Sequence, residues 1–238
     1  PAASDRLQER KAADKLQAAC TGQTAAVRSV EKKQKSTQPP KLYDLTSLQR
    51  DGNRLMGYTA QQVLDYAQAL YEKKLLTYPR TDSNYLTEDT AATVPGLVEV
   101  AVQSLPFSVE VGPPDVARVV DGSKVSDHHA LLPTMQVRSD TLAALPAGER
   151  NVLTLVIVRL LCAVGEKQVY EDTAAALECG GVSFSARGRV VTVPGWKAIE
   201  QMFLSTLKQK TEKEEPEARA LPPLAEGQTF SGCKAAVR

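Results

Sequence analysis

The stretch Leu75-Leu76-Thr77-Tyr78-Pro79-Arg80-Thr81-Asp82-Ser83 places a phenol, a guanidinium, a carboxylate and several hydroxyls within a few residues of one another. A proline fixes its own φ and disfavours helical backbone in the residue before it, so Tyr78 and Arg80 are predicted to lie outside any regular helix. In an extended segment, side chains two residues apart project to the same side. The sequence therefore predicts that the Tyr78 phenol and the Arg80 guanidinium can reach one substrate group together.

A phosphodiester suits this pair of side chains. Tyrosine can attack phosphorus to form a phosphotyrosine, and this reaction can run backwards without ATP. Free tyrosine titrates near pH ~10, so the attack needs help from a guanidinium that holds the non-bridging oxygens as their charge grows. A simpler interpretation stays open for these residues alone, because Tyr-x-Arg pairs are common: Tyr78 as a half-buried aromatic at a strand end and Arg80 as a surface charge.

The composition narrows the class of protein. The chain has 238 residues, of which 42% are hydrophobic, enough to bury a core in one large domain or two smaller ones. The net charge of +1 favours no partner, so any attraction to nucleic acid must come from local clusters. One basic cluster comprises Arg28, Lys32, Lys33, Lys35 and Lys41, and it fits a solvated strand face as well as a path for phosphates.

Metal, disulfide and membrane signals are weak. The cysteines Cys20, Cys162, Cys179 and Cys233 lack C-x-x-C spacing, and the two histidines are adjacent, so neither a zinc site nor a disulfide framework is predicted. No signal peptide or apolar run of transmembrane length occurs, which indicates a soluble protein of a reducing compartment. Because the chain begins at Pro1 and stops in an apparent strand, we expect it to be a piece of a larger protein.

The N-terminal part is predicted to contain one helix and one strand. Ser4-Asp5 can cap a helix that stops near Gly22, and residues 24–35 alternate apolar with polar residues as a strand does. Residues 36–40 then form a linker whose double proline marks a domain boundary.

The middle of the chain is predicted to be helical. One helix runs from Thr46 to Gly57, and a second follows with Thr59 and Gln62 at capping-box spacing, so the pair resembles a helix-turn-helix. Thr87 can cap a short helix, and Pro95 fits the first position of another that reaches about Gln103. Ser139 or Asp140 is expected to open a short helix, a long one is expected over 149–164, and residues 106–126 are expected to form a loop.

The C-terminal part is predicted to be mainly β. Short strands are expected at 173–178, 182–186, 190–193 and 228–237, with turns at Gly180-Gly181 and Gly188, a helix after Trp196 and a charged linker at 208–218. The predicted fold class is therefore α+β and multidomain. A helical domain at 40–171 is inserted into a discontinuous β-rich domain at 1–39 and 172–238.

A second stretch with usable chemistry is Asp127-His128-His129-Ala130-Leu131-Leu132-Pro133-Thr134. Imidazole carries protons and binds phosphate near neutral pH, although a histidine pair at the end of a loop is equally compatible with a surface feature.

These motifs, in this order, resemble a type IA DNA topoisomerase, most closely the bacterial topoisomerase III branch. The segments that carry the likeness are 39–49, 57–62, 70–73, 77–83, 127–134 and 188–196. The most specific are Tyr-Pro-Arg-Thr-Asp-Ser and Asp-His-His-Ala-x-x-Pro-Thr. The resemblance implies that the β-rich part is the arch of the enzyme and that the helical part carries the nucleophile.

The resemblance also implies roles for individual residues. Tyr78 would attack single-stranded DNA to give a 5′-phosphotyrosine, Arg80 would brace the scissile phosphate, and His128 would contact that phosphate or move a proton. Thr81, Asp82 and Ser83 would position these groups. Arg80, His128, His129 and Gln49 are the expected contacts to DNA.

One part of the family pattern is missing from the sequence. No Asp-x-Asp-x-x-Glu spacing occurs, so the Mg²⁺-binding Toprim domain of the family is expected to lie outside this chain, together with the second domain that grips DNA. No cofactor is expected within the chain, which should be monomeric, unable to relax supercoils alone, and located in the bacterial cytoplasm at nucleoid or plasmid DNA.

Two other functions have partly similar sequence features. Tyrosine recombinases also combine tyrosine with arginines and histidines, but they form 3′-phosphotyrosine and carry the tyrosine near the C-terminus. A non-catalytic helix-turn-helix module would bind duplex DNA in a salt-dependent way without needing Tyr78.

Overall fold

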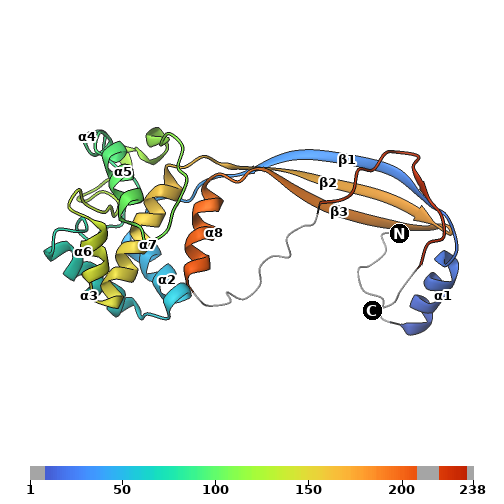
Figure 1. Ribbon diagram of the computed structural model, residues 1–238, viewed down its shortest axis with the longest axis horizontal. Helices are drawn as coiled ribbons and strands as arrows, with labels where there is room; N and C mark the ends of the chain where they lie inside the picture. The colour runs from blue at the N-terminus through green and yellow to red at the C-terminus, as the bar shows by residue number, and fades with distance from the viewer. Residues whose placement is uncertain (1–8, 208–219, 235–238) are drawn as a thin grey trace. The chain divides into compact units, whose positions relative to one another are not determined.

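The computed structural model describes residues 9–207 and 220–234, which divide into two compact units. One unit draws on Pro1–Ser36, Val169–Thr192 and Lys213–Arg238, and the other on Thr37–Gln168 and Val193–Glu212. Strands dominate the first unit and helices the second (Figure 1). The predicted mixture of helices and sheet is confirmed. The Ser4-Asp5 cap and the linker at 208–218 lie outside the described residues.

The first unit is built on a four-stranded sheet with the order β3-β2-β1-β4. Its elements are α1 (Arg10–Cys20), β1 (Ala25–Thr37), β2 (Gln168–Cys179), β3 (Val182–Val193) and β4 (Thr229–Phe230). Strand β4 pairs antiparallel with β1, with Ala25 opposite Phe230. Gly180 and Gly181 both have positive φ, as the tight turn between β2 and β3 requires.

Two predictions about the strands were wrong. Gly188 was expected to separate two strands, but it is a buried residue within the single strand β3 and has no positive φ. A glycine can stay in a strand when its neighbours continue the pairing. The last strand was expected over 228–237, but only Thr229 and Phe230 pair with β1, while residues 235–237 lie outside the described part.

The second unit is a cluster of helices around α7 (Ala147–Ala163), which contacts α2, α3, α5, α6 and α8 (Figure 1). Its other elements are α2 (Leu45–Met56), α3 (Ala60–Glu72), α4 (Glu88–Ala91), α5 (Val94–Ser104), α6 (Ser139–Ala144), α8 (Trp196–Thr206) and two 3-10 turns at Val116–Val119 and Gly122–Lys124. Most side chains of α7 are buried because it is apolar on nearly all sides. The capping box of Thr59 with Gln62 is confirmed, with bonds of 2.9 and 3.1 Å.

Helix α8 belongs with the helices, whereas the sequence prediction grouped residues 172–238 with the strands. Trp196, Ile199 and Phe203 on one face of α8 are buried in the same hydrophobic core as α7. The Trp196 indole N–H also donates to the Thr37 carbonyl at 3.2 Å. Three large apolar side chains on one helical face need a partner surface, and α7 provides it. No helix within the described residues is long and apolar enough to cross a membrane.

Candidate active site

The end of helix α3 sets the direction of the 75–83 segment. Lys74 has a φ of 61°, the left-handed conformation that ends many helices. The Lys74 N–H donates to the Tyr71 carbonyl and the Leu75 N–H to the Leu70 carbonyl, each at 2.9 Å. These two bonds form a Schellman motif. The chain therefore leaves the helix in a fixed direction a few residues before Tyr78.

The two motif segments, 75–83 and 127–134, lie side by side. Leu76 forms an antiparallel bridge with Pro133. The Thr77 N–H donates to the Leu132 carbonyl, and the Leu132 N–H returns a bond to the Thr77 hydroxyl, both at 3.0 Å. Stretches separated by about fifty residues in the sequence are thereby joined by backbone hydrogen bonds at the point where Tyr78 follows.

Tyr78 lies between a histidine and a second tyrosine. Its ring centroid is 4.4 Å from that of His128, with the rings tilted by 45°, and 5.4 Å from that of Tyr71 in an edge-on arrangement. Tyr78 is half-buried, while His128 is exposed. In the sequence, Tyr78 and His128 are linked only by the resemblance, and no signal marks Tyr71 as a neighbour of Tyr78, although it lies within the last turn of α3, where its carbonyl accepts a bond of the Schellman motif.

Arg80 lies at the centre of a three-residue turn, because the Thr81 N–H donates to the Pro79 carbonyl at 3.0 Å. This geometry differs from the uninterrupted extended backbone that the prediction of a shared side for Tyr78 and Arg80 assumed. Arg80 is exposed and makes no hydrogen bond or ion pair with any residue of 9–207 or 220–234. Its donors are therefore available to an anion.

Thr81 and Ser83 tie the tyrosine segment to the histidine loop. The Thr81 hydroxyl donates to the His128 carbonyl at 2.8 Å, and the Ser83 hydroxyl donates to the Lys124 carbonyl at the same distance. Both residues are buried. Buried hydroxyls bonded to another segment hold that segment in place, so these two residues fit the positioning role that the resemblance implies.

The remaining predicted site residues have weaker links to Tyr78. Asp82 is exposed and accepts a bond from the Ser126 hydroxyl at 3.3 Å, which joins it to the same loop. His129 is half-buried and holds its own turn, with Nδ1 2.7 Å from the next carbonyl oxygen. Gln49 donates to the first carbonyl of α3 at 3.0 Å. Among the described residues, no contact of Gln49 joins it to Tyr78 or His128.

Residues 43–45 form backbone hydrogen bonds with both motif segments. The Leu45 N–H donates to the Thr81 carbonyl at 3.0 Å, and the Leu131 N–H donates to the Tyr43 carbonyl at 2.8 Å. The backbone position of Tyr43 therefore affects where both Tyr78 and His128 are placed.

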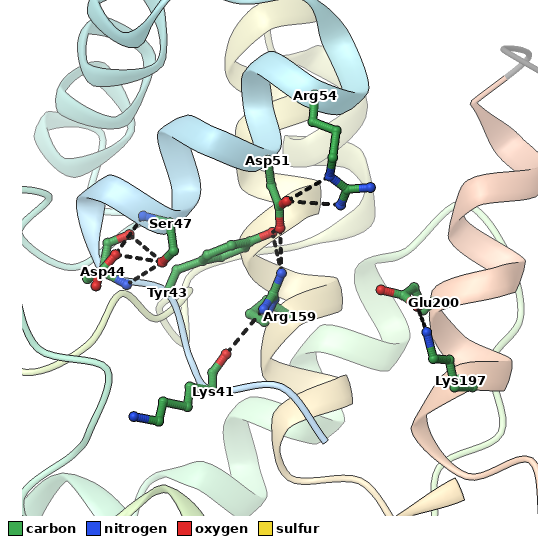
Figure 2. A network of polar contacts seen from close by, with 9 residues as sticks. All are labelled: Lys41, Tyr43, Asp44, Ser47, Asp51, Arg54, Arg159, Lys197 and Glu200. Carbon is green, nitrogen blue, oxygen red and sulfur yellow. Dashed lines mark hydrogen bonds and ion pairs between the residues drawn. The ribbon is translucent and has the colours of Figure 1, made fainter. Parts of the chain in front are cut away.

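A polar network fixes Tyr43 (Figure 2). The Tyr43 hydroxyl donates to Asp51 Oδ2 at 2.7 Å, while Arg159 donates to the same oxygen at 2.5 Å and to the Tyr43 hydroxyl at 3.0 Å. Arg54 bonds the other Asp51 oxygen at 2.9 Å. An adjacent cavity of about 30 Å³ has room for one water molecule and none for a nucleotide. The network is therefore structural, and its only local signal in the sequence is the charge of Arg159 within the largely apolar run 152–164.

The charges in this network shift its titration. Burial by itself raises the pKa of the Asp51 carboxyl. Hydrogen bonds from Tyr43 and Arg54 and the charge of Arg159 lower this pKa by more than burial raises it, so the net pKa lies below its usual value. Burial likewise raises the pKa of the Tyr43 phenol, which stays protonated and able to donate. Asp51 is thus held as a carboxylate between two guanidinium groups.

The described residues do not fit a metal site. No group of three or more His, Cys, Asp and Glu side chains suited to a metal ion occurs within 9–207 and 220–234.

Comparisons with known proteins agree with the motifs. The family profile described as DNA topoisomerase matches residues 2–238. DNA topoisomerase 3 of Bacillus licheniformis is 36% identical over 223 residues, which cover 91% of this chain and 30% of that protein. DNA topoisomerase 3 of Bacillus subtilis is 36% identical over 217 residues, which cover 88% of this chain and 29% of that protein. This chain thus spans under a third of the length of these relatives.

The fold has a counterpart among solved structures. Full-length topoisomerase I from Thermotoga maritima matches with a TM-score of 0.66 at 18% identity, over 98% of this chain and 36% of that one. The family profile, the relatives and the shared fold confirm the resemblance read from the sequence, and the chain belongs to the DNA topoisomerase family as a type IA, topoisomerase III-like member.

Proposed function

We propose that Tyr78 cleaves single-stranded DNA and later reseals it. The Tyr78 oxygen bonds to phosphorus while the bond from phosphorus to the 3′ oxygen breaks. The 3′ oxygen leaves with a proton, and the 5′ end stays on the protein as a phosphotyrosine. Resealing reverses each step, so no ATP is consumed. The observation that supports this best is the ring contact of 4.4 Å between Tyr78 and His128, two motif residues fifty positions apart.

The neighbours of Tyr78 have complementary roles in the proposal. Arg80 binds the non-bridging oxygens, because its guanidinium is exposed and without an internal partner among the described residues. His128 donates to the phosphate or carries a proton. Thr81 and Ser83 keep the histidine loop against the tyrosine segment.

The activity of the complete enzyme extends this proposal. We propose that an enzyme containing this chain passes one DNA strand through the opened strand and so changes DNA topology. Its Mg²⁺ would be bound by a Toprim domain that residues 1–238 do not include, and Mg²⁺ would supply charge stabilisation there. Its place would be the bacterial cytoplasm, at nucleoid or plasmid DNA.

The chemistry can be tested on the chain itself with a trapping substrate. A single-stranded oligonucleotide with a sulfur in place of the bridging 3′ oxygen releases a thiol, which leaves readily because thiols titrate near pH ~8.5. Such a leaving group needs no proton donor from another domain and reseals poorly. We expect mass spectrometry to locate a DNA adduct on Tyr78, and the Tyr78→Phe protein to form none. An equal adduct in Tyr78→Phe would overturn the assignment.

The same experiment separates the competing functions. A tyrosine-recombinase reaction would leave the 3′ end on the protein, and a helix-turn-helix binding module would form no adduct and would bind duplex DNA in preference to single strands. In a plasmid assay with Mg²⁺, we expect the 238-residue chain alone to leave supercoils unrelaxed. Relaxation by the unsubstituted chain, absent in Tyr78→Phe, would contradict that expectation.

A further inference from the structure

Two lysines converge on one aromatic ring close to the proposed active site. The ammonium of Lys41 lies 5.0 Å from the centroid of the Tyr85 ring, and that of Lys124 lies 4.6 Å from it. The electron-rich ring attracts each ammonium, while the two like charges repel each other. An anion that contacts both lysines relieves this repulsion. The pair is therefore prepared for an anionic ligand.

Backbone hydrogen bonds place this pair beside the tyrosine site. The Ala130 N–H donates to the Tyr85 carbonyl at 2.9 Å. Tyr85 is thus hydrogen-bonded to the residue two positions after His128. The Lys124 carbonyl accepts the bond from Ser83 described above. Tyr85 and Lys124 are therefore bonded to the same two segments that carry Tyr78 and His128.

The other members of the basic cluster each have a carboxylate partner and no shared ring. Arg28 pairs with Glu178 at 3.0 Å, and Lys35 pairs with Asp172 at the same distance. Lys32 and Lys33 also have carboxylate partners, Glu171 and Glu31. Among the described residues, no cation–ring contact gathers any of these four side chains, and each already has a carboxylate neighbour.

Lys41 differs from these four residues. It is exposed and makes no ion pair with a carboxylate in the described part of the chain. Lys124 has Asp121 at 2.5 Å, but with its side chain 56% exposed, such a pair contributes little and can open to a phosphate. The charge of Lys41 is thus available to a phosphate. The charge of Lys124 becomes available once its weak pair with Asp121 opens.

We propose that Lys41, Lys124 and Tyr85 form a second DNA contact that holds the sugar-phosphate backbone of a single strand next to the linkage attacked by Tyr78. The choice of single-stranded DNA as the ligand rests on the proposed function. The Tyr85 ring keeps two flexible lysines near each other, which lowers the entropy lost when both bind phosphate. Lysine binds phosphate as a point charge, so this contact is independent of base sequence.

The salt dependence of binding tests the two lysines. Fluorescence anisotropy of the 238-residue chain with a labelled oligothymidylate is measured over a series of salt concentrations. Each lost phosphate contact reduces the slope of log K against log salt by about 0.7 for single strands. We expect this reduction in Lys41→Ala and in Lys124→Ala, and about twice as much in the double variant, together with weaker binding.

Lys197→Ala provides a matched control. Lys197 also lies over an aromatic ring, 4.5 Å from that of Trp196, and pairs with Glu200 three residues away, as Lys124 does with Asp121. It should leave the slope unchanged. Slopes in Lys41→Ala and Lys124→Ala equal to that in Lys197→Ala would overturn the proposed contact, as would failure of the unsubstituted chain to bind the single strand.

Substitution of the ring tests its separate contribution. Tyr85→Phe keeps the aromatic face and should bind within about twofold of the unsubstituted chain. Tyr85→Leu should bind several-fold more weakly with an unchanged salt slope, because the lysines remain but are no longer held together. Equal DNA affinities of the Tyr85→Phe and Tyr85→Leu proteins would overturn the role of the ring. Circular dichroism checks that both variants fold.

The trapping experiment is independent of these titrations. An adduct on Tyr78 without the expected changes in slope would overturn this contact alone. Slope changes without an adduct would overturn the proposed chemistry alone.

Discussion

The Thr81 hydroxyl donates to the backbone carbonyl of His128 at 2.8 Å and at the same time accepts a bond from the Ser83 N–H at 3.2 Å. This one buried hydroxyl therefore links the segment of the proposed nucleophile to the histidine that contacts its ring. Its removal leaves a backbone carbonyl and an N–H without that partner, which is costly in a buried position.

Thr81→Val keeps the shape of the side chain and removes the hydroxyl. We expect the free energy of unfolding to fall by about 1–3 kcal/mol, measured by urea denaturation. Adduct formation on the trapping substrate should slow more than DNA binding weakens, because His128 loses its position relative to Tyr78. Thr81→Ser restores the hydroxyl and should recover both properties. Slowed adduct formation in Thr81→Ser would contradict the role of the bond.

Arg80→Ala should slow adduct formation by about 100-fold, since a donor aimed at growing phosphate charge is lost. Arg80→Lys should recover only a small part of the lost rate of adduct formation, because lysine cannot form the two parallel hydrogen bonds of a guanidinium. The side chain is exposed and has no partner within the described residues, so the melting temperature should stay nearly unchanged. Adduct formation at the original rate in Arg80→Lys would remove this role.

His128→Ala should slow the reaction by about 100-fold and alter the dependence of its rate on pH, as loss of a proton carrier does. His129→Ala is the comparison variant: as an expected DNA contact His129 can affect binding, but the described ring contact to Tyr78 comes from His128, so this variant should leave the pH dependence unchanged. Rates of adduct formation across pH 5 to 9 provide the measurement. An unaltered pH profile in His128→Ala would leave His128 with a structural role.

Asp51→Asn should destabilise the chain by about 3 kcal/mol at pH 7, because Arg159 loses the carboxylate that compensates its burial. The folded pKa of Asp51 lies below the unfolded value, so its contribution is complete above pH ~4 and is lost as the pH falls through the folded pKa. The stability difference between wild type and variant should therefore shrink at pH 3. Urea unfolding at both pH values measures it.

The control for Asp51→Asn is Asp65→Asn, which changes an exposed carboxylate on α3 that accepts a bond from Gln61. We expect this surface substitution to change the stability by less than about 0.5 kcal/mol. A stability gap for Asp51→Asn that is equally large at pH 7 and pH 3 would show that the charge of Asp51 is unimportant.

Lys74→Gly should raise the free energy of unfolding by about 1 kcal/mol. Lys74 has a φ of 61°, and a left-handed backbone costs an L-residue about 1–2 kcal/mol, of which glycine regains most. Lys74→Ala keeps the Cβ atom and should give no such gain. Thermal unfolding of the three proteins compares them, and equal stabilities of the Gly and Ala variants would argue against strain at this position.

Local signals in the sequence were sufficient for several elements. The hydroxyl of Thr59 and the amide of Gln62 close a capping box three residues apart, and Thr87 caps α4 as predicted, with a bond of 3.4 Å from the Thr90 N–H. Such contacts involve neighbours along the chain, so residue type and spacing determine them. Gly188 shows the limit, since a glycine has the same identity in a turn and in a paired strand, and only the neighbouring strand decides between them.

The sequence by itself determined the family, the two motifs and the alternation of helices and strands, because these depend on residue identity and short-range periodicity. Only the tertiary structure decided that Thr77 pairs with Leu132, that Arg159 and Asp51 fix Tyr43 across 108 residues, and that α8 packs on α7. Each of these contacts joins segments far apart in the chain. Their formation depends on which apolar faces are buried together, and no local pattern records that choice.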